Sequence, residues 1–302
     1  MTDVLNWKDS YDNTASRIVL TSRELQIPGL RSFGWQRDVS ASWPLPNHFH
    51  ENLLELTFIA EGNYTFRIGG ADYPLKGGEL FIAYPNEIHS TNQLAMSVGE
   101  FYWLQLDPGC LDDFLFLSQK AAAFLQKQLL FGGRHVLSVN RKEIFGLLAR
   151  AFSCAREGGE ANRYLCASFL VMILNLVSRK PPDELPSFTP DIEAALHYIH
   201  SNIREELSLE TIAVQTGLSL SQFKLKFRQQ TGSPPRVYIN RLKIELSKEM
   251  LLAGKTKTEI AMELGFSTSS YFTSVFRKYT ACTPSEFLRK QSGETAAEHT
   301  EP

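Results

Sequence analysis

Apolar and polar side chains alternate strictly from Asn63 to Ile68, in the order Asn-Tyr-Thr-Phe-Arg-Ile. A period of two is the pattern of a β-strand that buries one of its faces. Gly69-Gly70 follows, and glycine accepts the positive φ angles that a two-residue hairpin turn requires. Comparable short segments, separated by turn residues, run from about residue 17 to residue 107. They predict an antiparallel β-barrel or sandwich.

Apolar residues recur at helical spacing in the next segment, residues 110–180. Asn140 and Glu143 read as a capping pair in front of one apolar stripe. That stripe consists of Ile144, Leu147, Leu148 and Ala151, and a second stripe consists of Leu165, Phe169, Met172, Ile173 and Leu176. Together they hold more apolar surface than a lone helix needs. Packing against the β domain and dimerisation are two compatible interpretations.

Proline is concentrated in residues 179–190, which hold four prolines in twelve positions. Because proline disfavours helix at its own position and at the residue before it, we place a linker at residues 181–190. Thr189 and Pro190 supply an N-cap and a first helical residue for the next helix. The predicted division is a β domain with an N-terminal arm (1–109), a helical segment (110–180), a second helical domain (191–291) and a polar, acidic tail (292–302) that we expect to be disordered.

The second helical domain contains an internal repeat, which is the strongest pattern in the sequence. At an offset of 48 residues, Ile212, Ala213, Gly217, Ser219 and Ser221 recur as Ile260, Ala261, Gly265, Ser267 and Ser269. After one inserted residue, Phe223, Phe227, Arg228, Thr231 and Pro235 recur as Phe272, Phe276, Arg277, Thr280 and Pro284. The chain therefore carries two copies of one structural unit.

Each copy has the pattern of a helix, a turn and a second helix. Gly217 and Gly265 stand where the first helix must end, and glycine accepts the left-handed conformation of that position. The paired phenylalanines of each second helix are spaced i, i+4, so they anchor one side of it and leave the other side exposed. A plain helical bundle would explain one copy. Two copies joined by a predicted helix over 236–252 favour two helix-turn-helix units that enter successive major-groove segments of DNA.

Charge supports this interpretation only modestly. The formal net charge is −2, but residues 191–291 hold 14 Lys and Arg against 10 Asp and Glu. Basic residues gathered in one domain are typical of proteins that bind the phosphate backbone. The four cysteines show no C-x-x-C or zinc-type spacing, and no stretch approaches the roughly 18 apolar residues of a membrane span. We expect a cytoplasmic protein that does not associate with membranes.

The second unit resembles the signature of the AraC/XylS family of transcription regulators. The residues concerned are Ile260-Ala261-x-x-x-Gly265-Phe266-Ser267, Tyr271-Phe272-x-x-x-Phe276-Arg277-Lys278-Tyr279 and Thr283-Pro284-x-x-Phe287. Ala281-Cys282 departs from the family, which usually has Gly before a variable residue. The resemblance implies a two-domain α+β protein with a cupin-like N-terminal barrel and appended helices, and an all-α C-terminal domain with two helix-turn-helix units. It implies a non-enzymatic regulator that binds double-stranded DNA and a small-molecule effector.

The resemblance also places the DNA contacts on the second helix of each unit. The first unit would offer Ser221, Gln222, Lys224, Leu225 and Arg228, and the second Thr268, Ser269, Ser270, Thr273 and Ser274, with Arg277 and Lys278 at phosphates. Gln222 suits adenine and Lys224 suits guanine. Short hydroxyl side chains distinguish bases poorly. We therefore expect the first unit to read sequence and the second mainly to position the protein.

The N-terminal domain carries the pattern His48-x-His50, Glu55 and Pro85-x-x-x-His89, which resembles the metal motifs of cupin barrels. A metal-dependent cupin enzyme, a dioxygenase or isomerase fused to a helical module, is therefore the alternative function. It does not explain the repeat, and the usual glycine of the second cupin motif is absent. We expect no cofactor and no bound metal, with His48, His50, Glu55 and His89 as ligands in the alternative.

The family resemblance implies an effector pocket in the barrel. Its candidate lining residues are Trp35, Trp43, His48, His50, Glu55 and His89. Tryptophan beside a carboxylate suits a sugar, because the indole stacks on the ring and the carboxylate accepts hydroxyl protons. The regulator family is mostly activating, so RNA polymerase and a second copy of the chain are further expected partners. The sequence identifies neither the effector nor the operator.

Overall fold

Gly69 and Gly70 both adopt positive φ and join two antiparallel strands, as the alternation predicts. The preceding strand, β6 (Asn63–Ile68), buries Tyr64, Phe66 and Ile68 and leaves the residues between them half-buried. This hairpin belongs to a computed structural model that describes residues 5–6, 13–91, 95–110, 112–179 and 188–291. Most of the predicted linker, the predicted tail and part of the N-terminal arm lie outside the described residues.

The first unit, residues 13–38 and 44–179, is built on two β-sheets. One sheet has the strand order β1-β4-β9-β6-β7 and the other β11-β8-β5-β10-β3-β2. The strands are β1 (Leu5–Asn6), β2 (Arg17–Thr21), β3 (Leu30–Asp38), β4 (His48–Phe49), β5 (Leu54–Glu61), β7 (Ala71–Lys76), β8 (Glu79–Ala83), β9 (His89–Ser90), β10 (Gly99–Leu106) and β11 (Val136–Ser138). All described pairings except β1 with β4 are antiparallel.

One hydrophobic cluster of the first unit joins residues of both sheets and includes Phe66, Phe81, Phe101 and Trp103. The indole of Trp103 is 5% exposed and lies opposite Gly34 of the neighbouring strand. A Cβ at Gly34 would lie 2.1 Å from the indole, so only glycine leaves room for it there. This burial gives Trp103 a structural role in the core.

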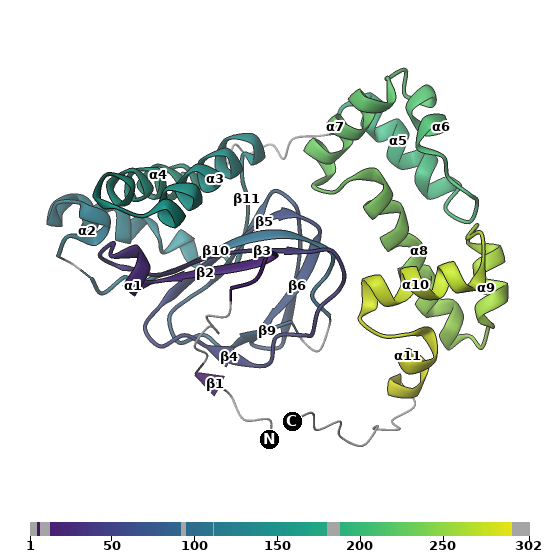
Figure 1. Ribbon diagram of the computed structural model, residues 1–302, viewed down its shortest axis with the longest axis horizontal. Helices are drawn as coiled ribbons and strands as arrows, with labels where there is room; N and C mark the ends of the chain where they lie inside the picture. Colours follow the sequence, from purple (N-terminus) through teal and green to yellow (C-terminus); the bar gives the residue numbers. More distant parts are fainter. Residues whose placement is uncertain (1–4, 7–12, 92–94, 111, 180–187, 292–302) are drawn as a thin grey trace. The chain divides into compact units, whose positions relative to one another are not determined.

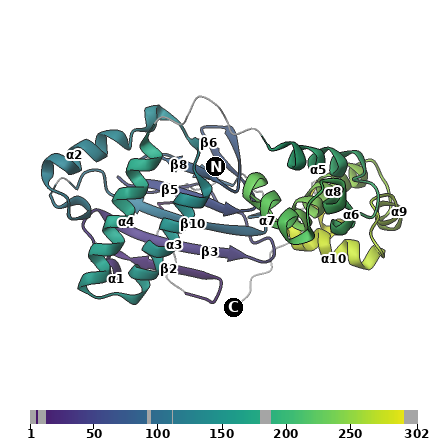
Figure 2. The ribbon, with the colours of Figure 1, turned by 90° about the horizontal axis from the view of Figure 1, so that it is seen from above.

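The helices of the first unit cover one face of the six-stranded sheet (Figures 1 and 2). They are α1 (Ser22–Leu25), α2 (Gln119–Gln128), α3 (Arg141–Glu157) and α4 (Glu160–Ser178), with 3-10 turns at Phe114–Phe116 and Phe131–Gly133. Asn140 caps α3 by accepting a hydrogen bond from the Glu143 amide, as the sequence predicts. Packing against the β domain is therefore observed for segment 110–180.

The apolar stripe predicted on α4 only partly faces the core. The buried residues of this helix are Cys166, Ala167, Leu170, Ile173, Leu174 and Val177. Of the predicted stripe only Ile173 is buried, whereas Leu165 and Met172 are 49% and 52% exposed. Among the described helices only α4 is long and apolar enough to cross a membrane, and its packed face is that of a core helix.

The second unit consists of residues 39–43, 188–230 and 234–291, and its regular secondary structure is helical. It consists of α5 (Pro190–Ser201), α6 (Leu209–Gln215), α7 (Leu220–Thr231), α8 (Pro235–Leu252), α9 (Lys257–Glu263), α10 (Ser269–Thr280) and α11 (Pro284–Gln291). The long helix α8 contributes Ile239 to one hydrophobic cluster with α5 to α7 and Ile244 to another with α9 and α10. Phe188 and Thr189, assigned to the linker, contact this unit instead.

Candidate nucleic-acid interface and barrel polar cluster

The helix α7 begins after a sharp turn that the sequence specifies locally. Gly217 ends α6 with a φ of 68°. Ser219 and Gln222 then cap α7 reciprocally: the Gln222 amide donates to Ser219 Oγ at 3.3 Å, and the Ser219 amide donates to Gln222 Oε1 at 3.1 Å. Phe223 and Phe227 are fully buried, which fixes the rotation of the helix about its axis.

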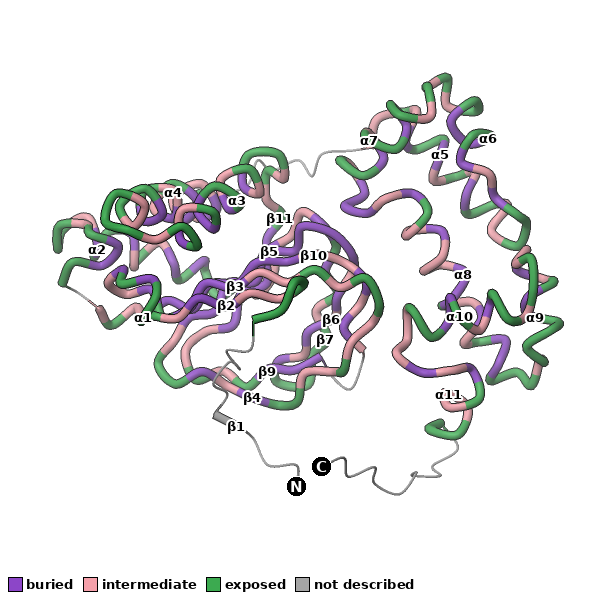
Figure 3. The backbone as a smooth tube through the Cα atoms, viewed as in Figure 1, coloured by how far each residue is buried: buried purple, intermediate pink, exposed green. Residues whose placement is uncertain are grey.

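The opposite side of α7 is exposed (Figure 3). Ser221, Gln222, Lys224, Leu225 and Arg228 are all exposed, and Leu225 is 60% exposed although it is apolar. Gln222 Oε1 accepts from both the amide and the hydroxyl of Ser219. A bidentate contact with adenine would therefore compete with the helix cap, whereas the side-chain amide nitrogen can donate to a base edge without breaking it.

The helix α10 repeats this arrangement with smaller side chains. Thr268, Ser270 and Ser274 are exposed, and Ser269 and Thr273 are half-buried. The Thr268 hydroxyl accepts from the Tyr271 amide, and the Thr273 hydroxyl donates to the Ser269 carbonyl. Two of the five predicted hydroxyl groups thus already have partners within the helix.

Two exposed residues on these helices were missed by the sequence prediction. Tyr271 is 49% exposed and corresponds to Gln222 at the offset of 49 residues. Gln229 is exposed and corresponds to Lys278. Applying the repeat offset to every position of α7 would have identified both residues.

Ion pairs in the second unit lie away from the predicted contacts. Lys226 pairs with Asp191 at 2.6 Å, and Lys255 pairs with Glu263 at 2.5 Å. Among the described residues, no ion pair within 4 Å involves Lys224 or the exposed Arg277-Lys278 pair. These three cations therefore have no competing carboxylate at contact distance, as phosphate binding requires.

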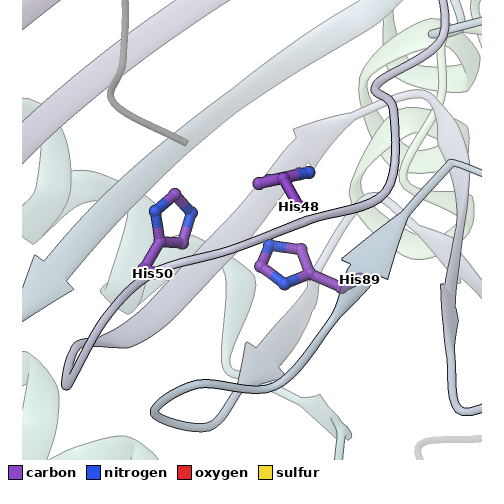
Figure 4. Close-up of side chains that lie close together, drawn as sticks. All are labelled: His48, His50 and His89. Atoms are coloured by element: carbon purple, nitrogen blue, oxygen red, sulfur yellow. The ribbon is translucent and has the colours of Figure 1, made fainter. Parts of the chain in front are cut away.

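A second group of polar residues lies in the first unit. His48 of β4 is the register partner of His89 of β9, and His50 follows β4 directly. The ring centroids of His48 and His89 are 4.2 Å apart, and that of His50 lies 5.2 and 5.4 Å from them (Figure 4). These three imidazoles and Glu55 are all less than 9% exposed. We call His48, His50, Glu55 and His89 the polar cluster.

Hydrogen bonds and charge hold Glu55 ionised in the polar cluster. Glu55 Oε2 lies 2.8 Å from His50 Nε2 and accepts from Gln105 at 3.1 Å, while Oε1 accepts from Thr57 at 3.2 Å. Burial is the largest single effect and raises the pKa of Glu55, but His50 and His89 together outweigh it and hold the pKa well below its usual range. Burial, aided by His89, lowers the pKa of His48 to about 4, so that ring is neutral at neutral pH.

The tryptophans predicted for the effector pocket lie apart from the polar cluster. Trp35 packs against the cluster of residues beneath α3 and α4, and its Nε1 donates to Glu100. Trp43 is 79% exposed. Gln105, which contacts both His50 and Glu55, was missed. Gln105 lies two residues after Trp103 on β10, so the two side chains lie on the same face of that strand.

Both units match known protein families. The family described as "AraC-like ligand binding domain" matches residues 41–174, and the family described as "Helix-turn-helix domain" matches residues 212–290. An uncharacterised HTH-type transcriptional regulator of Pseudoalteromonas carrageenovora is 36% identical over 98 residues, which are 32% of this chain and 58% of that protein. The chain thus spans just over half of that relative's length.

Longer matches have lower identity. The HTH-type transcriptional activator RhaS of Escherichia coli is 23% identical over 260 residues, covering 82% of this chain and 89% of RhaS. The crystal structure of ToxT from Vibrio cholerae shares 16% identity over 86% of this chain and 98% of ToxT, with a TM-score of 0.33.

A ligand-binding β domain followed by two helix-turn-helix units defines an effector-responsive, DNA-binding transcription regulator rather than an enzyme. The chain belongs to the AraC/XylS family. The fold and family expected from the sequence are confirmed. The cupin-enzyme alternative is wrong, because the two matched families are a ligand-binding and a helix-turn-helix domain, and the relatives are transcription regulators.

Proposed function

We propose that α7 and α10 are the two recognition helices and that they bind two boxes of one operator, about one helical turn or 34 Å apart. The observation that carries this proposal is the orientation of the two helices. Each buries a phenylalanine pair completely and exposes the opposite side, so equivalent surfaces of the two copies are left for DNA.

The two helices offer different kinds of DNA contact. On α7 the exposed residues include Gln222 and Lys224, whose side chains discriminate among base edges. On α10 hydroxyl groups predominate, and Arg277 and Lys278 offer charge at its C-terminal half. We expect α7 to set the sequence preference and α10 to hold register through phosphates.

Selection of bound duplexes from a random DNA pool by the full chain tests this proposal. Two enriched boxes separated by about 10–11 base pairs are expected. Enrichment of one box alone would contradict the role of α10. Binding that falls with salt but enriches no sequence would contradict the recognition role of both helices.

The domain boundaries expected from the sequence would separate effector binding from DNA binding. We propose that the first unit binds the effector and that this changes how a homodimer presents its DNA-binding units. The exposed face of α4 supports dimerisation, and the relative RhaS is named as an activator, which supports activation through RNA polymerase in the cytoplasm. A sugar effector has less support, since neither Trp35 nor Trp43 lies beside Glu55.

A saturating effector would have to change operator affinity, spacing preference or transcription. If a ligand that binds the first unit changed none of these three, the coupling would be wrong, because a ligand shifts an equilibrium only through its unequal affinity for the two states.

A further inference from the structure

We infer that His48, His50 and His89 bind one divalent transition-metal ion inside the first unit, with Glu55 as the adjoining carboxylate. This inference goes beyond the proposed function, because neither operator binding nor dimerisation requires a metal. It reverses the expectation drawn from the sequence, in which the metal site was the alternative.

Backbone carbonyl groups fix the tautomer of two of the rings. His48 Nδ1 lies 2.8 Å from the carbonyl oxygen of Pro46, and His89 Nδ1 lies 2.9 Å from that of Glu87. A carbonyl oxygen only accepts hydrogen bonds, so each neutral ring carries its proton on Nδ1 and leaves Nε2 as a lone-pair donor. Histidines that ligate metals are usually oriented in this way, by a carbonyl or carboxylate at the other ring nitrogen.

His89 supplies an independent observation. Its side chain is 1% exposed, and among the described residues its Nε2 has no hydrogen-bond partner. A buried polar atom without a partner is unfavourable, because it has lost its bonds to water. The nearest carboxylate oxygen, Glu55 Oε1, is 3.8 Å away, and an unprotonated Nε2 has no hydrogen to donate to it. A metal ion between the rings would satisfy it.

The three rings converge closely enough for one ion. One potential ligand atom from each ring lies within 4.8 Å of the others. Zinc–nitrogen bonds of about 2.0–2.1 Å in a tetrahedral site would place such atoms roughly 3.4 Å apart. Binding therefore requires the ligand atoms to approach one another by at most about 1.4 Å. The register of β4 with β9 already places His48 opposite His89.

The donor set limits the kind of ion. Imidazole ligands suit zinc, nickel, copper and iron, whereas calcium and magnesium prefer sets made of oxygen atoms only. Glu55 is anchored by Thr57 and Gln105, so it can either orient His50 or supply an oxygen to the ion. In both cases its negative charge offsets part of the charge of a divalent cation.

Metal binding by the full chain tests this inference without DNA or effector. The protein is stripped with EDTA, dialysed and titrated with Zn²⁺, and the bound metal is measured by elemental analysis after equilibrium dialysis. Titration with Co²⁺, whose visible absorption reports the ligand geometry, is the second readout. About one ion per chain is expected, and His89→Gln should weaken binding by at least about 100-fold, beyond the usual effect of losing an outer-shell partner.

His135→Gln is the matched control. His135 is a half-buried histidine of the same unit whose Nδ1 also contacts a backbone carbonyl, that of Ile82 at 3.0 Å. This variant should bind the metal like wild type, and Zn²⁺ should raise the melting temperature of both but not that of His89→Gln. Circular dichroism before titration shows that each variant is folded.

Two outcomes overturn the inference. One is a wild-type chain that retains no Zn²⁺ or Co²⁺ at micromolar free metal. The other is a folded His89→Gln variant that binds as tightly as wild type. Either result would leave a hydrogen-bonded histidine cluster without an ion. Because operator selection is a separate measurement, failure of the metal site and failure of the DNA-binding proposal are distinguishable.

Discussion

Gly217 and Gly265 occupy the same position in the two copies of the repeat and have similar φ angles, 68° and 60°. Their surroundings differ. A Cβ at Gly217 would meet nothing within 4 Å, whereas a Cβ at Gly265 would lie 2.5 Å from the backbone of Glu205 and Glu206. Glycine is therefore required for its conformation at the first position, and for conformation and space at the second.

Gly265→Ala should accordingly destabilise the second unit more than Gly217→Ala. The conformational cost of alanine at positive φ is about 1–2 kcal/mol, and the backbone clash at position 265 adds to it. Urea denaturation followed by far-ultraviolet circular dichroism measures the difference. Trp35 and Trp103 belong to the first unit, so the fluorescence transition that these two report should not move. Equal shifts in both variants would refute the predicted clash.

Ala281 is a non-glycine residue in the left-handed conformation, with a φ of 60° at the end of α10. It is also the position at which the sequence departs from the family's usual glycine. Ala281→Gly should raise the stability of the second unit by about 0.5–1 kcal/mol, because glycine adopts this conformation without strain. The midpoint of urea denaturation measures the gain.

Ala253→Gly is the control for that substitution. Ala253 ends α8 with a φ of −77°, where glycine has no conformational advantage and makes the unfolded chain more flexible. It should lower the midpoint slightly. A gain of equal size at both positions would show that the left-handed conformation is not the cause.

Some elements of the fold could be predicted from local sequence patterns and others could not. The cap of α3 at Asn140 and the strand at 63–68 depend on neighbouring residues, so local patterns predicted them correctly. The stripe predicted on α4 did not distinguish its buried face from its exposed one, because apolar residues surround most of this helix. Periodicity then cannot distinguish a face that packs on the sheet from one that stays exposed, and tertiary contacts decide.

The two candidate sites also differ in how far local sequence patterns predict them. The exposed faces of α7 and α10 follow from the phenylalanine spacing within each helix, and the sequence found most of their residues. The polar cluster is assembled from three strands, and the pairing of β4 with β9 brings His48 to His89 across 41 positions. A motif resemblance grouped these residues, but only the strand register separated them from Trp35 and added Gln105.

The capping role of Gln222 on α7 can be separated from its predicted role in reading DNA. In Gln222→Glu the carboxylate still caps Ser219, but the amide donor is lost. The stability should stay unchanged, whereas binding to the selected operator should weaken by about 1–3 kcal/mol and preference at one base position should relax. Fluorescence anisotropy with operator variants measures both effects.

Gln229→Glu places the same added charge on the same exposed side of α7. It should weaken binding to all duplexes alike, through repulsion from phosphates. If Gln222→Glu and Gln229→Glu changed the preferred sequence equally little, Gln222 would be only a capping residue.

The two units have separate hydrophobic cores. A substitution in the core of one unit should therefore leave the fold of the other unit intact. In the proposed homodimer, communication between the two units depends on how the protomers are arranged. We propose that the apolar stripe of α4 joins two copies. Leu165 and Met172 are exposed, whereas Phe169 and Leu176 are half-buried against the core. The four residues are spaced as on one face of a helix that packs against another helix.

Met172→Glu should therefore convert a dimer into a monomer. Met172 is 52% exposed in the single chain, so glutamate there does not disturb the core, but it would be buried unpaired in a dimer interface. Sedimentation velocity over a range of concentrations should show the dissociation constant raised at least about tenfold. Met262→Glu, on the 77% exposed methionine of α9, is the control and should leave the dimer intact. A Met172→Glu chain that dimerises like wild type would exclude α4 as the interface, and another surface would then have to join the two copies.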